Sequence, residues 1–304
     1  MQAHTSTVKA AQPATPADFD VPENACDCHT HIFGDPQKFP FFAGRVYTPP
    51  PALPEEMAAL HRALRIRRVV IVTASVYGTD NSATLHGIKA RGADARGVAV
   101  IDGKTSERDL DGLAAAGVCG VRLNLSTDGK NDPALARERL ASMLPRACAR
   151  NWHVQIFTNL NVVAGIKELV LAAPVPIVLD HFGGAQAALG PAQPGFADLV
   201  ELVRSGKAYV KISGAYRASR AAPDYADAAP LARALIAANA QRVVWGTDWP
   251  HTNSTTPPGR EVTEVTPFLA IDDGRLMNQL LLCAPDAVAR KAILVDNPAR
   301  LYGF

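Results

Sequence analysis

Eight short apolar segments, rich in β-branched residues, recur along this 304-residue sequence and constrain its fold more than any other feature. Stretches with helical spacing lie between most of them. We expect strands over residues 25–31, 68–74, 96–101, 120–125, 153–157, 175–181, 208–213 and 242–247, and helices over 54–64, 81–91, 107–116, 133–150, 162–172, 195–205 and 226–239. Most of the strands are apolar throughout, as is typical of parallel strands covered on both faces. The pattern predicts a (β/α)8 barrel, or TIM barrel, with a doubly wound open sheet as the alternative.

The chain is expected to form one domain. Neither a shift in composition nor a Gly/Ser-rich linker interrupts it after residue 23. Residues 1–22 mix Ala, Thr, Pro and Gln and lack the apolar core of a secretory signal. We therefore predict a flexible arm over residues 1–22 and a barrel over residues 23–304.

The composition argues against several classes of partner. The 31 basic residues nearly balance the 29 acidic ones, which gives no reason to expect a nucleic-acid or membrane-surface partner. No apolar run approaches the roughly 18 residues of a membrane span. Five cysteines are an odd number and fit a reducing compartment, so we predict a cytoplasmic protein. The oligomeric state stays open, with a homo-oligomer among the options.

Two histidines stand at the end of the first predicted strand. In a barrel, the carboxyl ends of the strands carry the chemistry. A period of two places Asp27, His29 and His31 on one face of the strand and directs Cys26 and Cys28 toward the helices as packing residues. The two imidazoles can converge on a metal ion or donate hydrogen bonds to one oxygen. The alternative is a pair of half-exposed histidines without a chemical role.

The sixth and eighth strands also end in titratable residues. The sixth ends in Asp180-His181, of which we expect His181 to point inward. The eighth ends in Asp248-Trp249-Pro250-His251. We favour a catalytic Asp248 over a helix cap, whereas His251 has a weaker claim.

Two arginines, Arg122 and Arg217, follow the fourth and seventh strands. Guanidinium groups at a barrel mouth suit bidentate binding of a carboxylate. A salt bridge with a loop acid is the alternative for each. Arg122 occupies the place where a bridging Lys or Glu could hold two metals, and no histidine ends the fifth strand, so we do not expect a binuclear site.

The order of these motifs resembles the amidohydrolase superfamily. HxH on the first strand, DHFGG on the sixth and GTDWPH on the eighth are similar to the branch that contains 2-pyrone-4,6-dicarboxylate lactonase, and the likeness runs from about residue 22 to the end. The resemblance implies that His29, His31 and His181 are the site histidines and that Asp248 is the general base. It also implies that Arg122 and Arg217 hold substrate carboxylates. The branch includes sugar-acid lactone isomerases and a sulfomuconolactone hydrolase, so it does not fix the substrate.

The sequence departs from that branch at two positions. Asp128 stands where the relative has a further substrate-binding Arg, and Phe157 stands where it has a Tyr. The loss of a cation and a hydroxyl disfavours the planar aromatic dicarboxylate. A lactone with one carboxylate, or with a differently spaced acidic group, fits better.

The expected function is hydrolysis of a small carboxylated lactone in the breakdown of aromatic compounds or sugar acids. Asp248 would activate water, and the histidines would stabilise the oxyanion. The alternatives are a mononuclear metal-dependent hydrolase or decarboxylase, a lactone isomerase, and a non-catalytic barrel that binds an acidic metabolite. The predicted substrate-binding set includes Arg122 and Arg217 and also Tyr47, Ser75, Asn159 and His251.

No cofactor is favoured, because the strand-four and strand-five ligands of many metal-dependent relatives are missing. The alternative is one Zn²⁺ or other divalent metal ion on the four residues His29, His31, His181 and Asp248.

Overall fold

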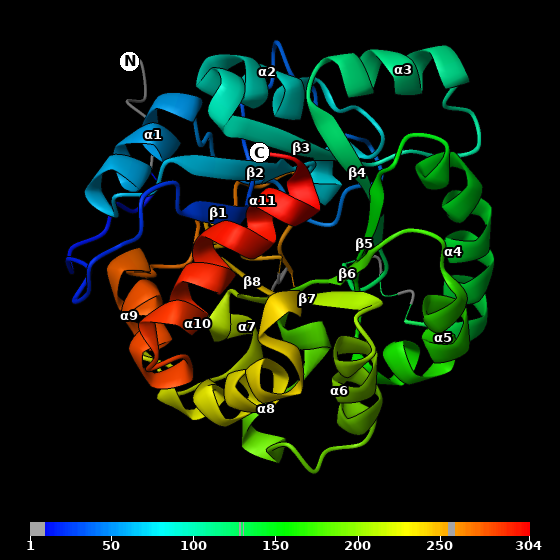
Figure 1. The fold of residues 1–304 in the computed structure, drawn as a ribbon. Coiled ribbons are helices and arrows are strands. Elements are labelled where there is room, and N and C mark those ends of the chain that lie inside the picture. The colour runs from blue at the N-terminus through cyan, green and yellow to red at the C-terminus, as the bar shows by residue number, and fades with distance from the viewer. Residues whose placement is uncertain (1–9, 128, 130, 255–258) are drawn as a thin grey trace.

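Eight parallel strands form one sheet in the order β1 to β8 (Figure 1). The computed structural model describes residues 10–127, 129, 131–254 and 259–304. The strands are β1 Cys26–Thr30, β2 Arg68–Val72, β3 Ala95–Ala99, β4 Val118–Asn124, β5 His153–Phe157, β6 Ile177–Leu179, β7 Ala208–Ser213 and β8 Val243–Gly246. This sequential order confirms the predicted (β/α)8 barrel, since a doubly wound sheet would place later strands on both sides of β1.

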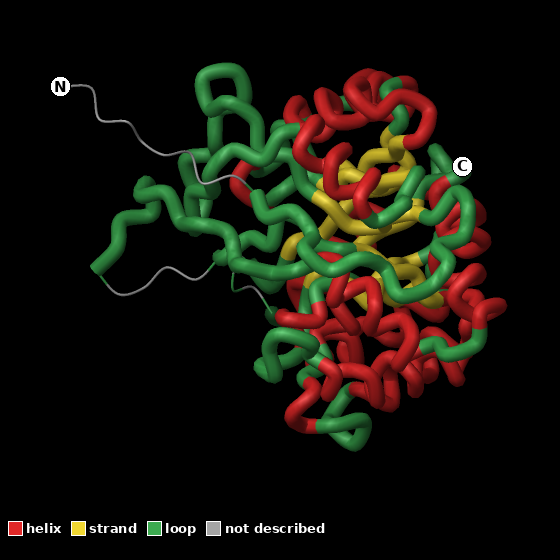
Figure 2. Tube along the Cα trace, turned by 90° about the vertical axis from the view of Figure 1, so that its left-hand side faces the viewer, coloured by secondary structure: helices red, strands yellow, loops and turns green. Residues whose placement is uncertain are grey.

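Helices surround the strands, and long loops gather on one side of them (Figure 2). The helices are α1 Pro54–Ala63, α2 Ser82–Arg91, α3 Glu107–Ala115, α4 Pro133–Cys148, α5 Leu160–Ala172, α6 Phe196–Arg204, α7 Ala215–Ala218, α8 Ala229–Asn239, α9 Asp273–Cys283, α10 Ala287–Lys291 and α11 Asn297–Tyr302. The seven predicted helices are present, while α7, α9, α10 and α11 were not predicted. No helix within the described residues is long and apolar enough to span a membrane.

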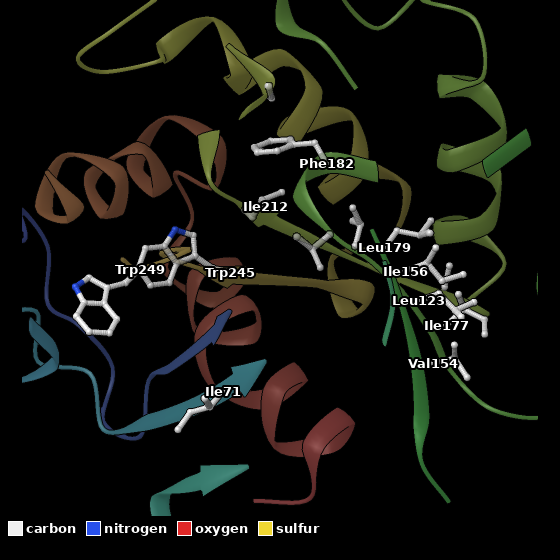
Figure 3. Packing of buried hydrophobic residues seen from close by; sticks show 14 of the residues in the cluster. Ile71, Leu123, Val154, Ile156, Ile177, Leu179, Phe182, Ile212, Trp245 and Trp249 are labelled. Carbon is white, nitrogen blue, oxygen red and sulfur yellow. The ribbon is translucent and has the colours of Figure 1, made fainter. Parts of the chain in front are cut away.

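Two apolar layers pack on opposite faces of the strands. The larger lies between the sheet and the helices, and Figure 3 shows Ile156, Ile177 and Leu179 of neighbouring strands together in it. The smaller brings together residues of β1, β2, β3, β6, β7 and β8, among them Val70, Val178 and Val244, and the α11 side chain of Tyr302. Strands from all round the barrel can meet in this way only inside it.

A bulge in β1 changes which of its residues face the interior. Asp27 pairs with Val69 and Thr30 with Ile71, so three steps along β1 match two along β2. Cys26 and Cys28 consequently belong to the interior layer, and Asp27 faces outward to His61 of α1. The prediction that Asp27 shares a face with the two histidines, and that the cysteines face the helices, is therefore wrong.

The seam between β8 and β1 is held by a side chain in addition to backbone contacts. In the described part of the chain, the two ends of the sheet are joined by an isolated bridge between Thr30 and Trp249 in place of a full ladder. The Asp27 carboxylate accepts hydrogen bonds from the Thr247 amide at 3.0 Å and the Thr247 hydroxyl at 2.5 Å. It also accepts one from the His29 amide at 3.1 Å. This carboxylate therefore adds two hydrogen bonds from Thr247 to the backbone contacts that close the barrel.

Residues 10–22 pack against α9, which differs from the flexible arm predicted for residues 1–22. The Thr15 hydroxyl donates to Asp272 at 2.6 Å, and the Asp18 amide donates to Asn278 at 2.8 Å. Ala17, Phe19 and Val21 pack on the main core. The remainder of the predicted arm, residues 1–9, lies outside the described residues.

Replacing Asp27 by Ala is expected to lower the free energy of unfolding by about 2 to 4 kcal/mol, because it leaves buried donors of Thr247 without a partner. Urea unfolding followed by circular dichroism measures this. The exposed Asp20 provides the matched control, Asp20→Ala, which should change stability by less than about 0.5 kcal/mol. Equal unfolding midpoints for the two variants would show that Asp27 does not hold the seam.

Candidate active site

Four predicted residues meet at the carboxyl end of the barrel. The Oδ1 atom of Asp248 lies 3.6 Å from Nε2 of His29, 3.7 Å from Nε2 of His31 and 3.8 Å from Nε2 of His181. All four side chains are buried. Strand ends that are far apart in the sequence thus direct three imidazoles and one carboxylate to one point.

The backbone turns sharply where these side chains leave the strands. His181 has φ +47° and Asp248 has φ +67°, both in the left-handed region that residues other than glycine rarely adopt. Gly214 after β7 also has positive φ, and a Cβ there would lie 2.9 Å from Oδ2 of Asp248. Backbone strain of this kind is common at functional sites.

The two oxygens of Asp248 have different surroundings. Oδ2 accepts a hydrogen bond from the Tyr216 hydroxyl at 2.6 Å and one from Nε of Arg217 at 2.5 Å. Oδ1 has no hydrogen-bond partner among the described residues. Burial raises the pKa of Asp248, but the Arg217 guanidinium and the three surrounding histidines together hold that pKa well below its ordinary value. Asp248 is therefore an oriented carboxylate with one oxygen free to act.

The surroundings of Nδ1 differ between two of the histidines. Nδ1 of His31 lies 2.8 Å from the Val72 carbonyl. A carbonyl only accepts, so Nδ1 of His31 is the donor and Nε2 presents its lone pair when the ring is neutral. Nδ1 of His181 lies 3.0 Å from the Ser213 hydroxyl, which can donate or accept, and 3.3 Å from the Ser213 carbonyl, so both tautomers of His181 find a partner there. Burial lowers the pKa of His181 to about 4, so this ring is neutral at pH 7.

This arrangement can hold a metal ion. His29, His31 and Asp248 form one group of converging ligand atoms, and His29, Asp180 and His181 form a second. Nε2 of His29 is also without a hydrogen-bond partner in the described part of the chain. Neutral imidazoles and a carboxylate are the ligand types that Zn²⁺ takes. The donor set thus fits a divalent ion.

A buried ionic layer lies directly beneath the four residues. Lys211 donates to the Gln155 side chain at 2.7 Å and to the Cys28 carbonyl at 2.8 Å, and its Nζ lies 3.3 Å from Nδ1 of His29. Asp180 accepts from Gln155 at 3.0 Å and from Nε of Arg122 at 3.1 Å. Both Asp180 and His181 therefore face inward, although only His181 was expected to.

The charges of this region do not cancel. Arg122, Lys211 and Arg217 are three buried or largely buried bases, and Asp180 and Asp248 are the two carboxylates paired with them. One positive charge is left over while the histidines are neutral. An unpaired buried charge is costly, so the region favours an anion.

Two hollows lie over these residues. The inner hollow is lined by Tyr47, Ser75, Arg122 and Arg217, together with His31, His181 and Asp248. The outer hollow is lined by Asn159, Gln186, Tyr216, Arg217 and Arg220. Phe157, His181 and Thr252 line both hollows, which therefore adjoin each other. Tyr47 and Ser75 thus lie at the inner part of the mouth, and Asn159 lies at the outer part.

One predicted substrate-binding residue, His251, lies outside both hollows. Its Nε2 pairs with the buried carboxylate of Asp273 at 3.0 Å, and its ring lies edge-on to Tyr216 at 5.5 Å. It supports the wall behind Tyr216, so its place in the predicted set is not supported.

Several site residues were missed from the sequence. Lys211 stands inside an apolar strand, and a charge in such a strand is a signal of a buried ionic contact. Tyr216 follows β7 beside Arg217 without any comparable signal. Phe157, one of the two departures that the sequence analysis expected, is edge-on to His181 with the ring centroids 5.2 Å apart. The second departure, Asp128, lies outside the described residues.

Comparison with known proteins places this site in a family. The amidohydrolase model matches residues 26–304. A 4-sulfomuconolactone hydrolase from Hydrogenophaga intermedia is 35% identical over 95% of this chain and 91% of its own. A 2-pyrone-4,6-dicarboxylate hydrolase from Comamonas testosteroni is 33% identical over 96% of this chain and 94% of its own. A D-galactarolactone isomerase from Agrobacterium fabrum is 31% identical over 92% of this chain and 91% of its own. A match of this extent means that the chain belongs to the amidohydrolase family.

Proposed function

We propose that this protein is a hydrolase that opens the ring of a small carboxylated lactone. The observation that carries the proposal is the difference between the two oxygens of Asp248. Oδ2 accepts hydrogen bonds from two donors, whereas Oδ1 has no hydrogen-bond partner among the described residues. Asp248 lines the inner hollow, whose excess of positive charge favours an anion. The names of the hydrolases that resemble the chain support the same reaction. These names favour a role for the reaction in the breakdown of aromatic compounds.

The reaction requires a base, a route for one proton and stabilisation of an oxyanion. Oδ1 of Asp248 takes a proton from water as the water oxygen bonds to the lactone carbonyl carbon. The ring C–O bond then breaks, and the departing ring oxygen takes the proton from Asp248. The product is a hydroxy acid, and the carboxylate is restored. Tyr216 and Arg217 hold Oδ2 throughout, which keeps Oδ1 directed at the water.

The histidine geometry favours the metal-bound alternative over direct hydrogen bonding by the imidazoles. Nδ1 of His31 donates to the Val72 carbonyl, so Nε2 of the neutral ring presents a lone pair, which suits a metal ion and cannot stabilise an oxyanion. His29, His31, His181 and Asp248 would hold the metal ion. When bound there, a divalent ion would supply polarisation of the carbonyl and a lowered pKa of water, which suits Asp248 as a base because its own pKa is low.

The substrate carboxylate is assigned to Arg122 and Arg217. Both guanidinium groups line the inner hollow and are already oriented by Asp180 and Asp248. Oriented arginines lose little entropy when they bind a carboxylate. The net positive charge beneath the hollow adds to this attraction.

Isomerisation is the second candidate, because a base facing a lactone can move a proton instead of adding water, and one relative is a lactone isomerase. Turnover in H2¹⁸O separates the two reactions. Hydrolysis places one ¹⁸O atom in the product, and isomerisation places none.

Asp248→Asn is expected to lower kcat by about 10² to 10⁴-fold, since the amide keeps the size of the side chain but cannot take a proton. Initial rates of lactone opening, followed by the release of acid, measure this. Thermal melting checks that the variant is folded. Activity close to that of the unmodified protein would remove Asp248 from the mechanism.

Protein purified without added metal is expected to contain about one equivalent of a divalent ion, and prolonged chelation should abolish turnover until Zn²⁺ is restored. Elemental analysis of the protein and of His181→Asn measures the metal content, with the exposed His86→Asn as the matched control. Full activity in metal-depleted protein would instead support direct action by the imidazoles.

Arg122→Met is expected to raise KM for a carboxylated lactone by about 10 to 100-fold, because a charge-assisted contact is lost, and to change KM little for a neutral lactone. We also expect weak turnover of 2-pyrone-4,6-dicarboxylate, since Phe157 lacks the hydroxyl of the relative. Steady-state kinetics on the three substrates test both statements. Efficient turnover of the pyrone would show that this departure does not control specificity.

A further inference from the structure

The outer hollow contains a cation that the proposed reaction does not use. Arg220 lies three residues beyond Arg217 and is exposed. It makes no hydrogen bond or ion pair with any residue in the described ranges. Each arginine of the inner hollow, by contrast, is paired with a carboxylate. Arg220 is therefore the cation at this mouth with its full hydrogen-bonding capacity available.

The chemistry around Arg220 suits an anion. The other polar side chains that line the outer hollow include the neutral Asn159, Gln186 and Ser254, and no described acidic residue lines it. A guanidinium group without an acidic competitor binds a carboxylate or sulfonate through parallel hydrogen bonds. Neutral amides and hydroxyls can donate to the same group.

The position of Arg220 relates it to the reaction site. Phe157, His181 and Arg217 line both hollows, so Arg220 lines the hollow next to the one that contains Asp248. The single positive charge left over beneath the inner hollow matches one substrate carboxylate. A second acidic group on the same substrate would lack a partner there.

We propose that Arg220 forms a second anion subsite, which binds an acidic substituent of the substrate other than the carboxylate held by Arg122 and Arg217. The proposal rests on the proposed lactone hydrolysis for the placement of the ring. It names the substrate class as a lactone with two acidic groups, one in each of the two adjoining hollows. Arg220 is a specificity residue in this scheme and does not touch the reacting atoms.

A matched pair of substrates tests the subsite in turnover. 4-Sulfomuconolactone and the corresponding lactone without the sulfonate differ by one acidic group. Arg220→Met should raise KM for 4-sulfomuconolactone by about fivefold relative to KM for the lactone without the sulfonate, as expected for a partly exposed contact to a charged group. Arg220→Lys keeps the positive charge and should return this KM ratio part of the way to that of the unmodified protein. Added salt should reduce the difference in KM between the two substrates. Arg204→Met, which removes an exposed arginine at the end of α6, serves as the control and should leave the ratio unchanged.

A binding measurement separates failure of the subsite from failure of the proposed function. Isophthalate and benzoate contain no lactone, and they carry two carboxylates and one. Calorimetric titration should show that Arg220→Met weakens the binding of isophthalate about fivefold more than the binding of benzoate. Equal weakening of both, or none, would overturn the subsite even if lactones are hydrolysed. Selective weakening in a protein that opens no lactone would support the subsite and overturn the proposed reaction.

Discussion

The barrel depends on a carboxylate placed where its backbone ladder is interrupted. Asp27 joins the two ends of the sheet through the amide and hydroxyl of Thr247. The backbone hydrogen bonds beside Asp27 involve active-site residues. The Asp248 amide donates to the His29 carbonyl at 2.9 Å, and the His31 amide donates to the Trp249 carbonyl at 2.9 Å. The same seam that closes the fold therefore sets the spacing between the base and two of the histidines.

The active site keeps its charges buried by pairing them in a fixed order from the interior to the mouth. Lys211 and Gln155 lie deepest, Asp180 connects them to Arg122, and Asp248 with Arg217 lies nearest the substrate. Charges in a low-dielectric interior are costly unless they are paired and hydrogen-bonded. Such a layer cannot rearrange easily, so the groups that face the substrate are oriented before it binds.

The sequence predicted the barrel and the four converging residues because both follow from apolar strands that end in polar side chains. It failed where a local irregularity changed the geometry. Alternation placed Asp27 beside the histidines, but the bulge in β1 turns it outward. Tyr216 lies in α7 directly after β7, and this helix of four residues is too short to show a periodic pattern. His251 has the right residue type, but its pairing with Asp273 depends on a distant helix. The cytoplasmic location stays a prediction, and the oligomeric state stays open.

The bulge in β1 also separates two tasks that one short segment performs. Asp27, His29 and His31 look like a single alternating motif, yet one residue stabilises the closed sheet and two serve the reaction. The division is set by the number of residues between them and not by their chemical type. Deleting one residue within the segment would keep every functional group and still exchange the inner and outer faces, so the length of this strand is itself under functional constraint.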